Sequence, residues 1–92
     1  MDLIINFKSI GNIALELKQD RKLIDILDFS FKADLDTVLI DTVDKFLKKN
    51  RINLLSLNRI TIAGDIDKHS SAYTVVKTWI SAVKGINEGH KW

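Results

Sequence analysis

Two carboxylates and an imidazole follow the last stretch of the sequence that reads as a strand. Asp65, Asp67 and His69 come directly after residues 59–64, in a loop position where α/β proteins often place metal ligands. The same residue types are favoured in solvated turns before a helix, by their turn geometry and by the helix dipole. Nothing else in the sequence completes a ligand set, so we expect neither a metal nor a cofactor.

Candidates for covalent or acid–base catalysis are few. The chain has no cysteine, which excludes thiol catalysis and zinc sites of the cysteine type. Its only histidines are His69 and His90, and His90 lies in the terminal tail, so a nucleophile with a histidine base is not indicated. A phosphate-binding loop needs several glycines, whereas residues 64–74 contain only Gly64. We therefore expect a protein that is not an enzyme.

Basic residues concentrate at one place, near the end of the first expected helix: Lys45, Lys48, Lys49 and Arg51. Such a cluster could contact the phosphates of tRNA. It also complements a helix C-terminus and can pair with Asp41 and Asp44, four residues before Lys45 and Lys48. The formal net charge is only +2, and no long basic stripe is present, so direct nucleic-acid binding is not the expected function.

The order of elements follows from hydrophobic periodicity. Alternating apolar residues predict strands, and apolar steps of three and four residues predict helices. The predicted strands span 2–8, 12–19, 23–31 and 59–64, and the predicted helices run from Leu35 for about four turns and from Ser70 or Ser71 to about Ile86. The resulting fold class is α/β with the order βββαβα, a mixed sheet and two helices packed on one face. Residues 1–86 form a single domain, and 87–92 form a C-terminal tail.

The third predicted strand has two different faces. Asp25 lies on one face with Leu23, Leu27, Phe29 and Phe31, while Ile24 and Ile26 lie on the other. The fourth strand follows a helical crossover, so we expect it to run parallel to a member of the three-stranded meander.

The two predicted helices carry more apolar surface than one sheet needs, with apolar arcs of roughly 180–200° on a helical wheel. One interpretation is that these side chains all pack on the sheet and on each other. The other is that part of the surface binds a partner, because exposed apolar patches on small domains mark interaction sites. The residues expected at this interface are Leu35, Val38, Leu39, Thr42, Phe46, Tyr73, Val75, Val76, Trp79, Ala82, Val83 and Ile86.

Composition favours a globular domain in the cytoplasm. The chain is 46% hydrophobic and 28% charged, and no apolar run approaches the roughly 20 residues of a membrane span. The first residues lack the basic start and small cleavage-site residues of a signal peptide. We expect a cytoplasmic protein with no membrane contact.

Three segments carry a resemblance to a known family. They are Leu39-Ile-Asp-Thr-Val-Asp-Lys-Phe-Leu47, Asn53-Leu-Leu-Ser-Leu-Asn-Arg-Ile-Thr-Ile-Ala-Gly64 and Ser71-Ala-Tyr-Thr-Val-Val-Lys-Thr-Trp-Ile-Ser-Ala-Val-Lys-Gly-Ile86. In this order, they resemble the amino-terminal lobe of the TsaB family, also called YeaZ. The resemblance implies a single ribonuclease H-like lobe of the actin-like ATPase fold.

The resemblance also implies a function. TsaB is a noncatalytic accessory of its homologue TsaD in making threonylcarbamoyladenosine in tRNA, and it pairs through the two helices of this lobe. The expected partner is therefore a second copy or a TsaD-like protein. Asn6 stands where related ATPases carry an aspartate, and Val75 and Trp79 replace glycines of the family. The alternative is a small nucleotide- or metal-binding domain that uses Asn6, Ser9, Asp65 and Asp67.

Overall fold

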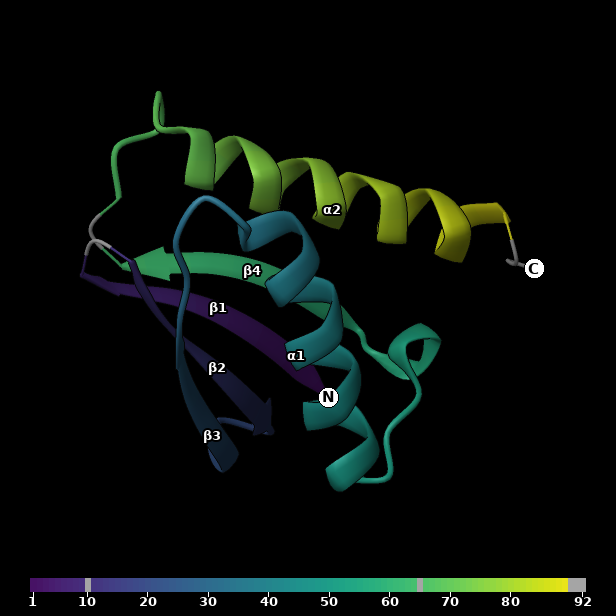
Figure 1. The fold of residues 1–92 in the computed structure, drawn as a ribbon. Coiled ribbons are helices and arrows are strands. Elements are labelled where there is room, and N and C mark those ends of the chain that lie inside the picture. The colour runs from purple at the N-terminus through teal and green to yellow at the C-terminus, as the bar shows by residue number, and fades with distance from the viewer. Residues whose placement is uncertain (10, 65, 90–92) are drawn as a thin grey trace.

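The computed structural model describes residues 1–9, 11–64 and 66–89, with side chains described as far as Lys84. The chain forms one layer of four strands and one layer of two helices (Figure 1). The elements are β1 Asp2–Ser9, β2 Asn12–Gln19, β3 Lys22–Ser30, α1 Leu35–Lys49, the short 3₁₀ helix η1 Leu54–Ser56, β4 Arg59–Gly64 and α2 Ser71–Gly89. The predicted order βββαβα is confirmed.

The sheet is mixed, with the strand order β3-β2-β1-β4. β1 and β2 are antiparallel, as are β2 and β3, whereas β4 lies parallel to β1 with Ile5 opposite Ile62. The predicted parallel partner of the fourth strand is therefore found in β1. The β2–β3 turn has positive φ angles at Asp20 and Arg21 (52° and 70°), as a two-residue hairpin turn requires for its twist to match the strands.

A β-bulge corrects the prediction for one residue of β3. Leu17 is opposite Asp25, but the next residue of β2, Lys18, is opposite Leu23. The extra residue, Ile24, reverses the alternation of side chains. Leu23 therefore shares the face of Lys18, opposite to the face of Asp25 and Leu27, and its side chain is 52% exposed.

The core lies between the sheet and the helices. Leu3, Ile5 and Phe7 of β1 and Ile13, Leu15 and Leu17 of β2 alternate toward the helices and are buried. The buried residues of α1 recur at three- and four-residue steps, as an amphipathic helix on a sheet requires: Leu35, Leu39, Val43, Phe46 and Leu47. Val76, Ile80 and Val83 of α2 join the same core. Both helices thus cover one face of the sheet (Figure 1).

Helix α2 begins where the sequence predicts and ends later than predicted. The Ser70 hydroxyl accepts a hydrogen bond from the Tyr73 amide at 3.2 Å, so Ser70 caps the helix. The helix continues to Gly89, past its predicted end near Ile86, because Asn87 and Glu88 are compatible with a helix and no proline interrupts it. The predicted tail therefore begins later than residue 87. His90 and the last two residues lie outside the described part of the chain.

Candidate protein-interaction groove

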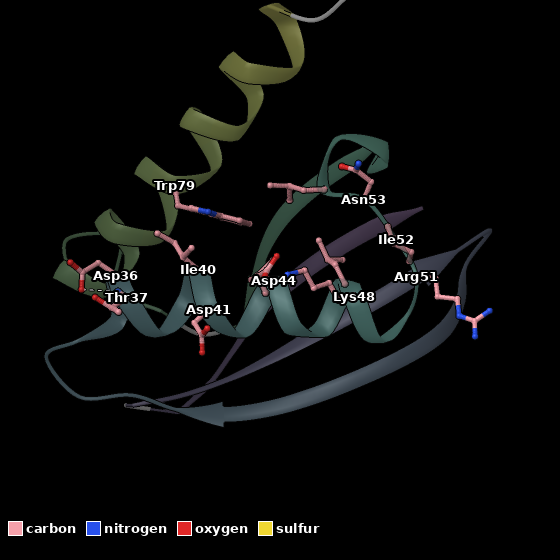
Figure 2. A pocket seen from close by; sticks show the side chains of 13 residues that line it. Asp36, Thr37, Ile40, Asp41, Asp44, Lys48, Arg51, Ile52, Asn53 and Trp79 are labelled. Carbon is pink, nitrogen blue, oxygen red and sulfur yellow. Dashed lines mark hydrogen bonds and ion pairs between the residues drawn. The ribbon is translucent and has the colours of Figure 1, made fainter.

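An open groove of about 990 Å³ lies where α1 and α2 diverge. Its walls are the exposed flank of α1, the segment that follows α1 and the indole of Trp79 from α2 (Figure 2). We call it the helix groove, and it is lined by Asp36, Thr37, Ile40, Asp41, Val43, Asp44, Leu47, Lys48, Arg51, Ile52, Asn53, Leu54 and Trp79. Its apolar members come from α1, from the segment directly after α1 and from α2.

Ile40 is the most exposed of the large apolar side chains in the described residues, at 56%. It lies next to Leu39 in the sequence, but Leu39 is completely buried. Neighbouring helix positions point about 100° apart, so one of the two faces the core and the other faces the groove. Trp79 is partly buried against the core and also lines the groove. Figure 2 shows both side chains on the same side of the groove.

The far wall of the groove depends on how α1 ends. The Ile52 amide donates to the Leu47 carbonyl at 2.9 Å, and the Arg51 amide donates to the Lys48 carbonyl at 3.0 Å. With Arg51 at φ 58°, these bonds form a Schellman motif in which Ile52 and Leu47 occupy the positions that usually make an apolar contact. The motif turns the chain back beside α1 and brings Ile52 into the groove wall.

A side-chain hydrogen bond stabilises the start of η1, the short helix that follows this turn. The Asn53 side-chain oxygen accepts a hydrogen bond from the Leu55 amide at 3.0 Å. Asn53 thereby caps η1, satisfying one of the amides that a helix start leaves without a partner. Leu54, the first residue of η1, is partly buried and lines the groove.

Charges along the groove are separated by sign. The carboxylates Asp36, Asp41 and Asp44 come first along α1, and Lys48 and Arg51 lie at its C-terminal end. Lys48 forms an ion pair with Asp44 at 3.0 Å, with both side chains more than half exposed, so the pair contributes little to stability. Within the described residues, Asp36 and Arg51 form no ion pair. The groove therefore has an acidic and a basic end.

Asp25 connects the end of α1 to β3. Its Oδ2 accepts a hydrogen bond from the Asn50 side-chain amide at 3.0 Å and lies 3.3 Å from the Lys49 ammonium. Its Oδ1 accepts from the Ile26 amide at 2.8 Å. The hydrogen bond from Asn50, followed by that from Ile26, lowers the pKa of Asp25 below its ordinary value. The ionised carboxylate is thus the form that the fold stabilises.

The predicted interface residues differ in their exposure. Five of them are buried in the core of this chain and are corrected to core residues, because the sheet already covers them: Leu35, Leu39, Phe46, Val76 and Val83. Val38, Thr42, Tyr73, Val75 and Trp79 are partly buried, and Ala82 is exposed. The side chain of Ile86 lies outside the described part of the structure. Among the predicted residues whose side chains are described, only Trp79 lines the helix groove.

The sequence reasoning missed several groove residues. Ile40 was part of the apolar arc of the first helix, but the wheel gives no reason to place it on the partner side rather than on the sheet. Ile52 and Leu54 lie in a segment read as a loop. Asn53 offers one sequence signal for this segment, because asparagine side chains favour local capping hydrogen bonds. The turn after α1 has no such signal, because Arg51 occupies the left-handed position where glycine is usual.

The described residues of the alternative ligand site are engaged in hydrogen bonds within the chain. The Asn6 side-chain amide donates to Glu16 at 2.8 Å, and the Ser9 hydroxyl accepts from the Asn12 amide group at 2.8 Å. Asp67 accepts from the His69 backbone amide at 2.9 Å, the turn role that the sequence favours. Asp65 lies outside the described residues. Within the described ranges, no three acidic or histidine side chains gather in a metal-binding arrangement.

Two of the four residues of the basic cluster pair as the sequence predicts. Lys45 lies 3.0 Å from Asp41, and Lys48 lies 3.0 Å from Asp44. Lys49 pairs instead with Asp25 of β3, a contact between distant segments that helical spacing cannot reveal. In the part of the chain that is described, no helix is long and apolar enough to cross a membrane.

Comparisons add no family to this picture. No protein-family model and no curated protein matches the sequence. The functional conclusion therefore depends on the geometry of the helix groove.

Proposed function

We propose that this chain is a noncatalytic protein-interaction module that forms a homodimer through its helix groove. One observation supports the proposal above all. Ile40 is 56% exposed beside the indole of Trp79, in a groove whose other apolar walls are Val43, Leu47 and Ile52. Trp79 is partly buried in this groove, and tryptophan is enriched among the residues that dominate the binding energy of protein interfaces.

The charges of the groove support a second copy of the chain as the occupant. In a two-fold dimer, the same surface of each copy meets itself in the opposite direction. With the two α1 helices antiparallel, Asp36 of each copy approaches Lys48 and Arg51 of the other. Since Asp36 and Arg51 have no ion-pair partner among the described residues, this arrangement satisfies charges that the single chain leaves unpaired and opposes other orientations.

The resemblance to the TsaB family supports a more specific role. In this proposal, the chain is a ribonuclease H-like lobe, and the mixed four-stranded sheet with two helices is compatible with that fold. The chain acts in the cytoplasm as an accessory in the biosynthesis of threonylcarbamoyladenosine in tRNA and performs no chemistry and no direct nucleic-acid binding itself. A TsaD-like protein is the alternative occupant of the helix groove.

The dimer is tested with two matched substitutions. Ile40→Lys places a lysine four residues from both Asp36 and Asp44, so α1 tolerates it through ion pairs at helical spacing. Ile26→Lys is the control, because Ile26 is 43% exposed but lies on β3, away from the groove. Sedimentation equilibrium at micromolar concentrations measures the dimer dissociation constant for the native chain and for each variant.

We expect Ile40→Lys to weaken the dimer by roughly 100- to 1,000-fold, since each copy loses one central apolar contact. Ile26→Lys should leave the dissociation constant unchanged. A native chain that is monomeric and captures a TsaD-like protein would replace the homodimer with the heterodimer. A dimer that is insensitive to Ile40→Lys would rule out the helix groove as its interface.

A further inference from the structure

The sheet has a free edge at β3. This strand is hydrogen-bonded to β2 on one side and, within the described residues, to no strand on the other. The Phe31 amide donates to the Gly11 carbonyl at 2.9 Å, toward β2. Because successive amides of an antiparallel strand alternate in direction, the amides of Ile26, Asp28 and Ser30 point to the open side. Such an edge can pair with a further strand.

The same strand carries an exposed apolar strip. Leu23, Ile24 and Ile26 are 52%, 47% and 43% exposed. The β-bulge produces this strip, since it moves Leu23 to the face of Ile26, the face that the helices leave uncovered. We call these three residues the edge strip. In Figure 1, β3 lies at the opposite edge of the sheet from β4 and α2, so the edge strip is separate from the helix groove.

Asp25 occupies the middle of this edge. Its Oδ1 accepts the hydrogen bond of the Ile26 amide at 2.8 Å, so an amide that points to the open side is already satisfied. Its Oδ2 is held by Asn50 at 3.0 Å and by Lys49 at 3.3 Å, which fixes the carboxylate in place. An incoming strand would have to displace this carboxylate before it could bond to Ile26. A bulge and a charge at the edge are the means by which natural sheets prevent pairing.

We infer that the β3 edge is a strand-pairing surface for a second copy of this chain, and that Asp25 holds this surface closed. Antiparallel pairing about Ile26 brings Ile26 of the two copies together on the uncovered face. With Ile26 opposite Ile26, Asp28 of each copy lies opposite Ile24 of the other, so the two Asp28 carboxylates stay apart. In the same register, Asp20, just before β3, lies near Lys32, just after β3, of the other copy.

The test removes the cap while the helix groove is disabled. Every variant carries Ile40→Lys, so that association through the groove does not contribute. Asp25→Ala removes both the cap of Ile26 and the bond to α1, whereas Asp25→Asn keeps a side-chain oxygen that can accept from the Ile26 amide. Asp28→Ala is the matched control, because it removes an exposed carboxylate from the same strand without removing a cap. Far-UV circular dichroism verifies that each variant is folded.

Sedimentation equilibrium should show that Asp25→Ala raises the association constant by roughly thirtyfold. In the native chain, pairing breaks one Ile26–Asp25 hydrogen bond in each copy, at a net cost of about 1 kcal/mol each. Asp25→Ala removes this cost, and 1.4 kcal/mol corresponds to a tenfold change in the association constant. Asp25→Asn should associate less tightly than Asp25→Ala, and Asp28→Ala should show no increase. Adding Ile26→Lys to Asp25→Ala should restore the monomer.

Three results would each overturn the inference. The first is an association constant that Asp25→Ala leaves unchanged in a folded chain. The second is an equal increase for Asp28→Ala, which would indicate a general effect of lost negative charge. The third is a dimer of Asp25→Ala that persists with Ile26→Lys. Since Ile26→Lys leaves the helix groove intact and Ile40→Lys leaves the edge strip intact, failure of one dimer does not imply failure of the other.

Discussion

Gly64 ends β4 at the point where this strand meets the end of β1, opposite Phe7. Its φ is 96°, in a region where a side chain costs about 1–2 kcal/mol. A Cβ built on Gly64 would overlap the Phe7 carbonyl oxygen and would lie 2.8 Å from the Phe7 amide nitrogen and 2.7 Å from the Asn6 side-chain oxygen. Since two of these atoms belong to the backbone of β1, they cannot rotate away. Gly64→Ala therefore forces the two strands apart.

We expect Gly64→Ala to lower the free energy of unfolding by roughly 2–5 kcal/mol, from the strained φ together with overpacking of about 1–3 kcal/mol. Domains of this size are stable by roughly 5–15 kcal/mol, and each 1 kcal/mol shifts Tm by about 4–8 °C. The variant should thus melt at least about 8 °C lower. Urea denaturation followed by circular dichroism measures the free energy, and thermal melting measures Tm.

Gly11→Ala is the matched control for Gly64→Ala. Its φ is 79°, but among the described residues its Cβ would meet only the Phe31 carbonyl oxygen, at 3.2 Å. Gly11→Ala therefore introduces backbone strain but little overlap, so it should lower the free energy of unfolding by about 1–2 kcal/mol. A Gly64→Ala variant within about 0.5 kcal/mol of the native chain, or no less stable than Gly11→Ala, would refute the close approach of β4 to β1.

Two further predictions concern stability. Leu39→Ala should lower the free energy of unfolding by about 2–5 kcal/mol, because Leu39 is completely buried. Measured at a protein concentration low enough to keep the chain monomeric, Ile40→Ala should change this free energy by less than about 0.5 kcal/mol. Equal losses in urea denaturation would contradict the assignment of Leu39 to the core. Asp25→Asn tests the pH dependence. The pKa of Asp25 is lowered from 3.8 in the folded chain, so its contribution to stability is present above pH 3.8 and is lost as the pH falls through the folded pKa. The stability difference between the native chain and Asp25→Asn, measured by urea denaturation, should therefore shrink below pH 3.8, and a difference that is constant between pH 7 and pH 2 would contradict this assignment.

Periodicity was sufficient to predict the layers of this fold. The alternation of Ile13, Leu15 and Leu17 and the three- and four-residue steps of Leu35, Leu39 and Val43 each reflect one buried face. These patterns act over a few residues, and a sequence displays them directly. That β4 runs parallel to a strand of the meander followed from the helical crossover that precedes it, whereas the sequence did not indicate that this strand is β1.

The bulge and the groove could not be predicted in the same way. Leu23 changes face because one residue is inserted in the pairing with β2, and the alternation of apolar residues does not record where a strand gains a residue. Leu39 and Ile40 are both large and apolar, and the face that α1 turns toward the sheet decides that Leu39 is buried and Ile40 lines the groove. The contact of Asp25 with Lys49 and Asn50 joins segments 24 and 25 residues apart, beyond any local pattern.

The assignment of the dimer to the helix groove can be tested with single cysteines, since the native chain has none. Ile40→Cys and Ile26→Cys each place one thiol at an exposed apolar position, on α1 and on β3 respectively. Each variant is treated at micromolar concentration with a short bis-maleimide, and dimers are separated by denaturing electrophoresis. We predict that Ile40→Cys cross-links to a covalent dimer and that Ile26→Cys remains monomeric. Cross-linking of Ile26→Cys alone, or of neither variant, would contradict a homodimer formed through the helix groove.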